Sequence, residues 1–132
     1  MILVDSNVLM YAAGSDHPNK SIAVEFLARV ATGEVDAAID AEVLQEIIHR
    51  YRAIHRWSEG RTVFLLARKL FPDVIPITGE VMDRSKLLVD ADETVSARDA
   101  VHAAVLLVNK LDGIYTFDRD FDRIRGIKRI EQ

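Results

Sequence analysis

Short apolar segments alternate with longer segments of helical periodicity along this chain of 132 residues, and this alternation limits the folds open to it. Short apolar runs bounded by turn residues are typical of buried strands, whereas apolar residues every three or four positions indicate amphipathic helices. Alternating strands and helices predict an α/β fold, a three-layer α/β/α sandwich around a central, mainly parallel sheet of four to five short strands, in one domain of residues 1–132. The predicted strands are 2–4, 37–39, 74–77 and 114–116, with a further edge strand at 128–130.

The helical segments begin and end at recognisable signals. Asp40, Thr78 and Ser96 are residue types that cap helix N-termini well. The segment from Ser96 to about Leu111 is apolar on most sides, so we expect this helix to be buried. Gly113 suits the left-handed position that often follows a helix.

The composition excludes several classes of protein. The chain has no cysteine, which rules out disulfide bonds, a thiolate nucleophile and cysteine-ligated zinc. No segment approaches the roughly 20 apolar residues that span a bilayer, and an acid follows the first apolar run too soon for a signal peptide. We therefore expect a soluble cytoplasmic protein with no membrane partner. The net charge of −4 argues mildly against nucleic-acid binding, unless several acids surround divalent cations.

Two acids stand where strands of the predicted sheet end. Asp5 follows the strand at 2–4, and Asp118 follows the strand at 114–116. Ligands of α/β proteins bind at the carboxyl ends of the strands, so both side chains would emerge where sites form. Each acid also has a structural explanation, because Asp5 could cap a helix that starts near Asn7 and Asp118 could form an Asx-turn.

Two further acids lie on predicted helices. Asp99 stands three residues after Ser96, which is the spacing of a capping box, yet an acid in the first turn of a buried helix would also face the sheet edge. Glu46 lies beside the apolar stripe of the helix that follows Asp40, where a solvated surface glutamate is the alternative. Converging carboxylates could bind one or two hard cations such as Mg²⁺, which prefer oxygen ligands and can activate water against a phosphate.

Other catalytic chemistry has little support in the sequence. The chain contains no G-x-S-x-G nucleophile elbow, no G-x-x-x-x-G-K-[ST] phosphate loop and no H-E-x-x-H motif. His102 follows Asp99 by three residues in an apolar helix, so we expect a core or supporting histidine there and not a metal ligand.

Two basic segments are candidate RNA contacts. Residues 49–57 interleave arginines with Tyr51 and Trp57, a composition that suits phosphate contact and base stacking. A solvated helix end is the alternative, because the macrodipole favours cations there. The second segment adjoins Asp118. The candidate residues are Arg50, Arg52, Arg56, Arg119 and Arg123.

Four segments, in order along the chain, resemble the motifs of PIN-domain nucleases. They are LVDSNVL at 3–9, VLQEI at 43–47, ARDAVHAA at 97–104 and YTFDRDF at 115–121. One such motif alone would be weak, but four in order over nearly the whole chain are specific. The length and layout are most similar to the VapC toxins of bacterial and archaeal toxin–antitoxin pairs.

This resemblance implies an activity, a cofactor and partners. The activity would be hydrolysis of phosphodiester bonds by an endoribonuclease that depends on Mg²⁺ or Mn²⁺. The substrate would be structured RNA, often a loop of tRNA or ribosomal RNA. The resemblance also implies a homodimer and an antitoxin protein that blocks the site.

The resemblance also implies roles for individual residues. Asp5, Asp99 and Asp118 would bind metal, and Glu46 would bind a second ion or orient the attacking water. The positions that match the catalytic quartet are Asp5, Glu46, Asp99 and Asp118, and those that match supporting polar residues are Asn7 and Thr116. Glu42 and Asp120 are nearby acids that rank below Glu46 and Asp118.

Other functions stay open at this point. The chain could be a PIN-domain nuclease in RNA processing without a toxin role. It could also be a non-catalytic PIN-like module that keeps its acids for folding or partner contact. A phosphatase or receiver domain with an acidic pocket is a further alternative, although the first strand ends Asp-Ser-Asn and lacks the Asp-x-Asp of many phosphoaspartate phosphatases.

Overall fold

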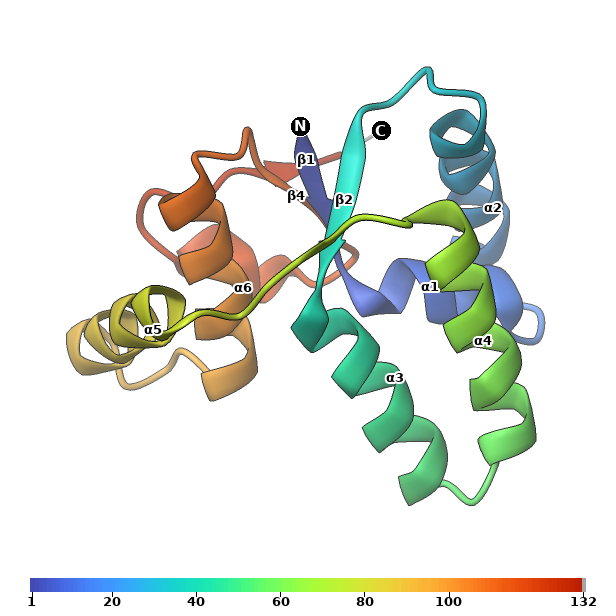
Figure 1. Cartoon of the computed structure of the whole chain (residues 1–132), viewed down its shortest axis with the longest axis horizontal. Coiled ribbons are helices and arrows are strands. Elements are labelled where there is room, and N and C mark those ends of the chain that lie inside the picture. The colour runs from blue at the N-terminus through green and yellow to red at the C-terminus, as the bar shows by residue number, and fades with distance from the viewer. Residues whose placement is uncertain (132) are drawn as a thin grey trace.

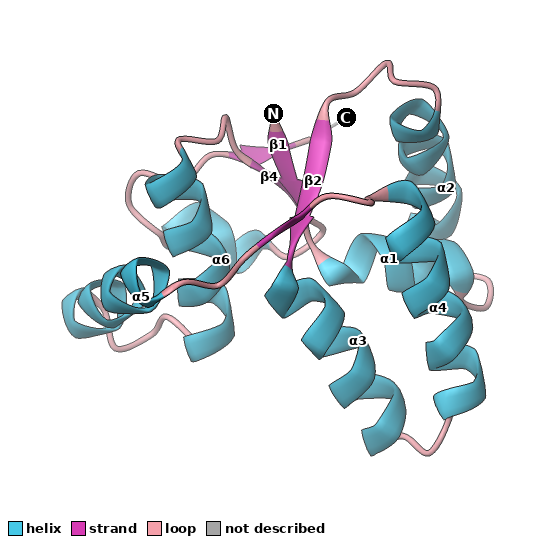
Figure 2. Cartoon of the chain, viewed as in Figure 1, coloured by secondary structure: helices cyan, strands magenta, loops and turns pink. Residues whose placement is uncertain are grey.

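A parallel sheet of five short strands forms the centre of the protein in the computed structural model, which describes residues 1–131 (Figures 1 and 2). The strands lie in the order β3-β2-β1-β4-β5, and each neighbouring pair is parallel. The carboxyl ends of the strands therefore meet at one edge of the sheet. The strands are β1 (Ile2–Val4), β2 (Ala37–Asp40), β3 (Val74–Ile75), β4 (Ile114–Tyr115) and β5 (Arg129–Ile130).

Helices cover both faces of the sheet, which confirms the predicted three-layer α/β/α sandwich (Figure 2). One face carries α1 (Ser6–Ala13), α2 (Pro18–Ala31), α3 (Ala41–Ala53) and α4 (Trp57–Leu70). The other carries α5 (Gly79–Ala91) and α6 (Ala97–Asn109), and a 3₁₀ helix, η1 (Arg119–Arg123), follows β4. Within residues 1–131, no helix combines the length and the apolar composition that crossing a bilayer requires.

The sheet separates two apolar cores. Successive side chains of a strand point to opposite faces, so Leu3 packs with α6 whereas Val4 packs with the helices of the opposite face. Leu3, Val4 and Ile114 have no exposed surface. The two central strands β1 and β4 are thus fixed on both faces, and the residues that follow them begin from rigid positions.

α6 is the buried helix that its composition predicts. Every residue from Asp99 to Leu106 is buried. Ser96 caps the helix, because its hydroxyl oxygen accepts a hydrogen bond from the Asp99 N–H at 3.1 Å. The predicted left-handed position at Gly113 is wrong, since Lys110 adopts that conformation with φ of 55°. A side chain at Gly113 is excluded for another reason: its Cβ would lie 2.6 Å from the Lys128 carbonyl oxygen next to β5.

Candidate functional site

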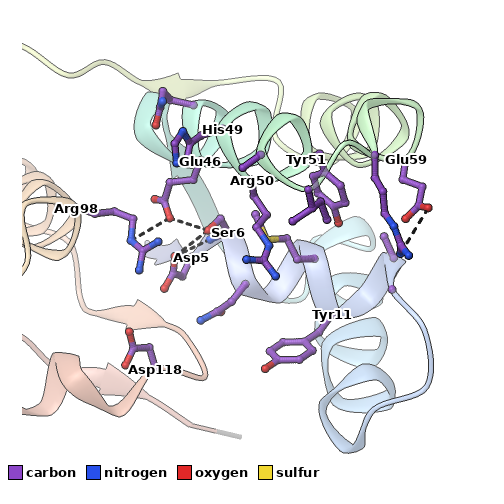
Figure 3. Close-up of a pocket in the computed structure, with 18 of the residues that line it drawn as sticks. Asp5, Ser6, Tyr11, Glu46, His49, Arg50, Tyr51, Glu59, Arg98 and Asp118 are labelled. Carbon is purple, nitrogen blue, oxygen red and sulfur yellow. Dashed lines mark hydrogen bonds and ion pairs between the residues drawn. The ribbon is translucent and has the colours of Figure 1, made fainter.

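Acidic side chains from several elements converge at the carboxyl ends of β1, β2 and β4. Asp5, Glu46 and Asp118 line an open pocket of about 1140 Å³ that continues between α1 and α3 (Figure 3). Asp5 follows β1, Asp40 ends β2, and Asp118 follows β4 after two residues. Glu46 reaches the pocket from α3, and Asp99 lies in the first turn of α6. The structure therefore brings the four predicted acids to one edge of the sheet, as parallel strands allow.

Asp5 caps a helix and faces the pocket at the same time. One carboxylate oxygen accepts a hydrogen bond from the Ser6 N–H at 2.7 Å, at the start of α1. The other accepts a hydrogen bond from the Thr116 hydroxyl at 2.7 Å. Only 6% of Asp5 is exposed. The capping interpretation and the site interpretation of this residue are thus compatible.

The Thr116 hydroxyl links the ends of β1 and β4. Besides donating to Asp5, its oxygen accepts hydrogen bonds from the Asn7 amide at 3.1 Å and from the Asp118 N–H at 3.0 Å. Asn7 and Thr116, the two polar residues expected to support the acids, therefore lie side by side. Their bonds fix the backbone of Asp118 relative to Asp5.

The inner end of the site is a buried network around Glu46. One oxygen of Glu46 accepts a hydrogen bond from the Ser6 hydroxyl at 2.9 Å, and the other contacts Nε2 of His102. Nδ1 of His102 lies 2.7 Å from Asp40, which also caps α3 by accepting from the Val43 N–H at 2.9 Å. We call Asp5, Glu46, His102 and Asp40 the inner cluster; each is at most 7% exposed.

His102 carries a positive charge in this network. Ionised carboxylates only accept hydrogen bonds, and each ring nitrogen faces one, so both nitrogens must bear a proton. Burial alone would lower the pKa of His102, but the charge of Asp40 and the hydrogen bonds to Asp40 and Glu46 outweigh it and raise the pKa well above the ordinary value of 6.5. His102 therefore supports the acids, as expected, and both of its ring nitrogens are already engaged by carboxylates.

Asp40 is the supporting residue that the sequence did not reveal. Its position after β2 marks it only as a helix cap, and it performs that role. The contact with His102 joins residues 62 positions apart. The sequence offered one signal for this contact. His102 lies one turn after Asp99, on a helix face directed toward the strand ends, where an acid such as Asp40 could meet it.

The outer end of the site is more exposed to solvent than the inner end. Asp99, Asp118 and Asp120 offer carboxylate oxygens that lie within 4.8 Å of one another, and we call these residues the outer cluster. The Asp118 carboxylate accepts a hydrogen bond from the Asp120 N–H at 2.9 Å, which is the Asx-type turn foreseen for it. Burial first, and then the charges of Asp118 and Asp5, raise the pKa of Asp99, and Arg98 opposes the shift.

The quartet is thus divided between two clusters. Oxygens of Asp5 and Glu46 and a nitrogen of His102 lie within 4.8 Å of one another at the inner end, while Asp99 and Asp118 group with Asp120 at the outer end. Glu42, which was ranked below Glu46, lines the pocket outside both clusters. Burial, followed by the charge of Glu46, raises the pKa of Glu42.

The predicted RNA-contacting arginines do not gather at one place. Arg50 and Arg56 line the pocket, and Arg52 does not. Arg123 pairs with Asp120 at 2.7 Å, and Arg119 lies in η1 outside the pocket lining. Arg98, which was not among the predicted RNA contacts, lies next to the quartet: its Nε is 3.4 Å from Glu46 (Figure 3).

The donor set fits a hard divalent cation. Carboxylate oxygens are the protein ligands that Mg²⁺ and Mn²⁺ prefer, and the described residues offer several of them here without a free nitrogen or sulfur ligand. Burial and then the charge of Asp118 raise the pKa of Asp99, and a cation beside it would offset this penalty on the ionised form. The site can therefore bind a divalent metal ion.

Comparisons with known proteins agree with this picture. The PIN domain family model matches residues 2–127. Ribonuclease VapC13 of Mycobacterium tuberculosis is 40% identical over 130 residues, which cover 98% of this chain and 99% of that protein. The crystal structure of Mycobacterium tuberculosis VapC20, described as a Sarcin-Ricin loop cleaving toxin, has a TM-score of 0.75 at 20% identity and covers 100% of both chains.

A further solved structure has the same fold. VapBC2 from Rickettsia felis, bound to a DNA fragment from its promoter, gives a TM-score of 0.74 at 16% identity, covering 99% of this chain and 100% of that one. At such identities the solved structures establish the fold alone. The family model and the 40% identical relative go further, and they show that this chain belongs to the PIN domain family, among its VapC-type ribonucleases.

Proposed function

We propose that this chain is a metal-dependent endoribonuclease that hydrolyses phosphodiester bonds of RNA, acting as one domain of residues 1–132 with Mg²⁺ or Mn²⁺. The observation that carries the proposal is the convergence of Asp5, Glu46, Asp99 and Asp118 at one end of the sheet, beside an open pocket. A chain that needed acids only as helix caps would have no reason to bury Asp5, Glu46 and Asp99 together.

Asp5, Asp99 and Asp118 are the proposed metal ligands. Asp5 belongs to the inner cluster, and its charge contributes to the raised pKa of Asp99 in the outer cluster, which supports a role for Asp5 in both. When bound, the ion would lower the pKa of a water molecule and offset charge on the reacting phosphate. Thr116 and Ser6 orient the Asp5 carboxylate by hydrogen bonds to its two oxygens.

Glu46 is the proposed residue that orients the attacking water. Its carboxylate is fixed by the Ser6 hydroxyl and by His102, so its position does not depend on metal. His102 contacts Glu46 in this buried site, and a carboxylate held in this way can accept a proton from water. His102 and Asp40 then act through Glu46 as positioning residues.

The substrate we propose is a loop of structured RNA, from tRNA or ribosomal RNA. The pocket is open, and Arg50 and Arg56 are among its lining residues, where they could contact neighbouring phosphates. The description of the VapC20 neighbour as a Sarcin-Ricin loop cleaving toxin is in keeping with this class of substrate.

The cellular role we propose is that of a toxin whose antitoxin blocks this pocket. The Rickettsia felis neighbour is a VapBC2 pair, and a further neighbour is a toxin–antitoxin complex from Klebsiella pneumoniae. We also propose a homodimer. Co-expression with the product of an adjacent small reading frame, followed by light scattering, would measure both associations.

A metal titration on RNA tests the activity. Purified protein is incubated with total bacterial RNA at increasing Mg²⁺ or Mn²⁺, with EDTA as the control, and the new RNA ends are sequenced. The proposal expects cleavage at few sites, absent in EDTA. Absence of cleavage at every metal concentration would favour a non-catalytic PIN-like module, and cleavage without growth arrest on expression would favour an RNA-processing role.

A further inference from the structure

Arg98 bridges the two clusters of the acidic site. It is the second residue of α6, and its Nε lies 3.4 Å from Oε2 of Glu46 and 3.9 Å from Oδ1 of Asp99. Within residues 1–131, no other Lys or Arg forms an ion pair with the four quartet acids. Figure 3 shows the guanidinium reaching across the pocket toward Glu46 and Asp5.

The contacts of Arg98 are loose. Both distances describe ion pairs without a hydrogen bond, and 58% of the Arg98 side chain is exposed, against 8% for Glu46 and 9% for Asp99. A long contact whose cation lies mostly in water contributes little free energy because water screens it. A divalent ion that bound Asp99 would therefore displace the guanidinium from it easily.

Arg98 also stands where it does not stabilise its own helix. The N-terminal turn of a helix carries partial positive charge, so a cation there is unfavourable, whereas Asp99 at the next position is favourable. Within residues 1–131, the terminal nitrogens of the guanidinium donate no hydrogen bond. These nitrogens keep the planar pair of donors that binds a phosphate with two hydrogen bonds.

We propose that Arg98 is a substrate-binding residue of the site, which offsets part of the charge of Glu46 and Asp99 in the metal-free protein and binds an RNA phosphate next to the ion when the metal is present. This proposal rests on the proposed ribonuclease function. It explains how a polyanion can approach a pocket lined by so many acids: the same guanidinium that compensates the carboxylates becomes available to the phosphate when the cation replaces it.

Two substitutions and one matched control test this proposal. Arg98→Gln removes the charge, and Arg98→Lys keeps the charge without the planar pair of donors. Arg84→Gln in α5 is the control, since Arg84 is exposed and lies outside the pocket. Circular dichroism first establishes that each variant is folded.

Metal binding without RNA is the first readout. In a Mn²⁺ titration followed by calorimetry, Arg98→Gln should bind Mn²⁺ about two- to fivefold more tightly than the wild type, because a competing cation is gone. Arg98→Lys and Arg84→Gln should stay near the wild-type affinity. Unchanged or weaker Mn²⁺ binding by Arg98→Gln would contradict competition between Arg98 and the ion.

RNA cleavage is the second readout, with an oligonucleotide that carries the mapped cut site. At saturating Mn²⁺, Arg98→Gln should lower kcat/KM about tenfold or more, mainly through a higher KM, and Arg98→Lys should recover only part of this loss. An unfolded variant would not bind Mn²⁺ more tightly while its kcat/KM for RNA falls, so this combination of results separates the proposal from loss of structure. Wild-type kcat/KM in Arg98→Gln overturns the phosphate contact.

The two proposals fail in different ways. If wild-type protein with Mn²⁺ cleaves no RNA, the ribonuclease function is wrong and the phosphate role of Arg98 falls with it, while the Mn²⁺ titration still decides whether Arg98 competes with the ion. If the wild type cleaves RNA and Arg98→Gln does so equally well, only the inference about Arg98 is wrong.

Discussion

The inner and outer ends of the acidic site contain similar carboxylates in different surroundings. At the inner end, Glu46 and Asp40 share the charged His102, and hydrogen bonds from Ser6 and the protein backbone satisfy their remaining oxygens. At the outer end, burial and the charge of Asp118 raise the pKa of Asp99, and Asp120 is exposed. The carboxylates of the inner end are held by a histidine and by hydrogen bonds, whereas at the outer end burial and the charge of Asp118 disfavour the ionised form of Asp99, a penalty that an ion would offset.

Asp5 belongs to the inner cluster and exerts its charge on the outer one, so its substitution should have the largest effect on activity. Asp5→Asn should lower metal-dependent kcat/KM by about 10³-fold or more, because loss of a metal ligand removes several kcal/mol of transition-state stabilisation. An asparagine can still accept the bond from the Ser6 N–H, so α1 should keep its cap. Single-turnover cleavage assays measure the change, and wild-type rates in the variant would show that Asp5 is not a ligand.

His102 should matter most for the stability of the inner end. In His102→Ala, the carboxylates of Asp40 and Glu46 lose the buried cation between them, which should lower the free energy of unfolding by about 3–5 kcal/mol. Urea denaturation measures this loss. His49→Ala is the matched control, since His49 is exposed and its replacement should change stability by about 0.5 kcal/mol or less. Equal effects of the two substitutions would mean that the inner cluster is not ion-paired.

Alkaline pH should weaken the inner end in the wild-type protein. The pKa of His102 is raised on folding, so its contribution to stability is complete below pH 6.5 and is lost as the pH rises from there through the folded-state pKa. Over that window the free energy of unfolding should fall by up to about 1.4 kcal/mol per pH unit. Urea denaturation at a series of pH values measures the slope, and ¹⁵N NMR should find both ring nitrogens of His102 protonated at neutral pH. A ring that is neutral at pH 7 would refute the assignment.

Replacing Asp99 should change stability less than replacing His102, and it should increase the stability of the metal-free protein. Its pKa is raised on folding, so its ionised form destabilises the metal-free fold at neutral pH, and Asp99→Asn should stabilise that form by on the order of 1 kcal/mol or less. Thermal unfolding in EDTA tests the sign. Added Mg²⁺ should raise the Tm of the wild type more than that of the variant, because the variant has lost a ligand. A variant that is less stable in EDTA would indicate that Asp99 is compensated without metal.

Local patterns were sufficient to predict the elements that position the site. β1 has its predicted bounds, and β2 ends at Asp40, one residue beyond the end predicted for it. Capping by Asp40, Thr78 and Ser96 was also predictable, because a capping bond joins residues only three positions apart. The periodicity and the capping chemistry act over one helical turn or one strand, so they can be recognised without knowledge of the packed structure.

Contacts between distant elements were not predictable in this way. Lys110 ends α6 in the left-handed conformation where glycine was expected at 113, and Gly113 is required because β5 passes next to it. In the sequence, Arg98 has the features of an ordinary surface residue. Its guanidinium lies near both Glu46 and Asp99 only because α3 packs beside α6.

The sequence by itself determined that this chain folds as alternating strands and helices and that acids follow its central strands. Only the tertiary structure decided how those acids are grouped: Asp5 and Glu46 with His102, and Asp99 and Asp118 with Asp120. The physical reason is the separation along the chain between the residues that interact. Strand and helix signals arise from neighbouring residues, whereas the charge state of a buried carboxylate depends on which distant cation, hydroxyl or second carboxylate the packing brings within a few ångströms.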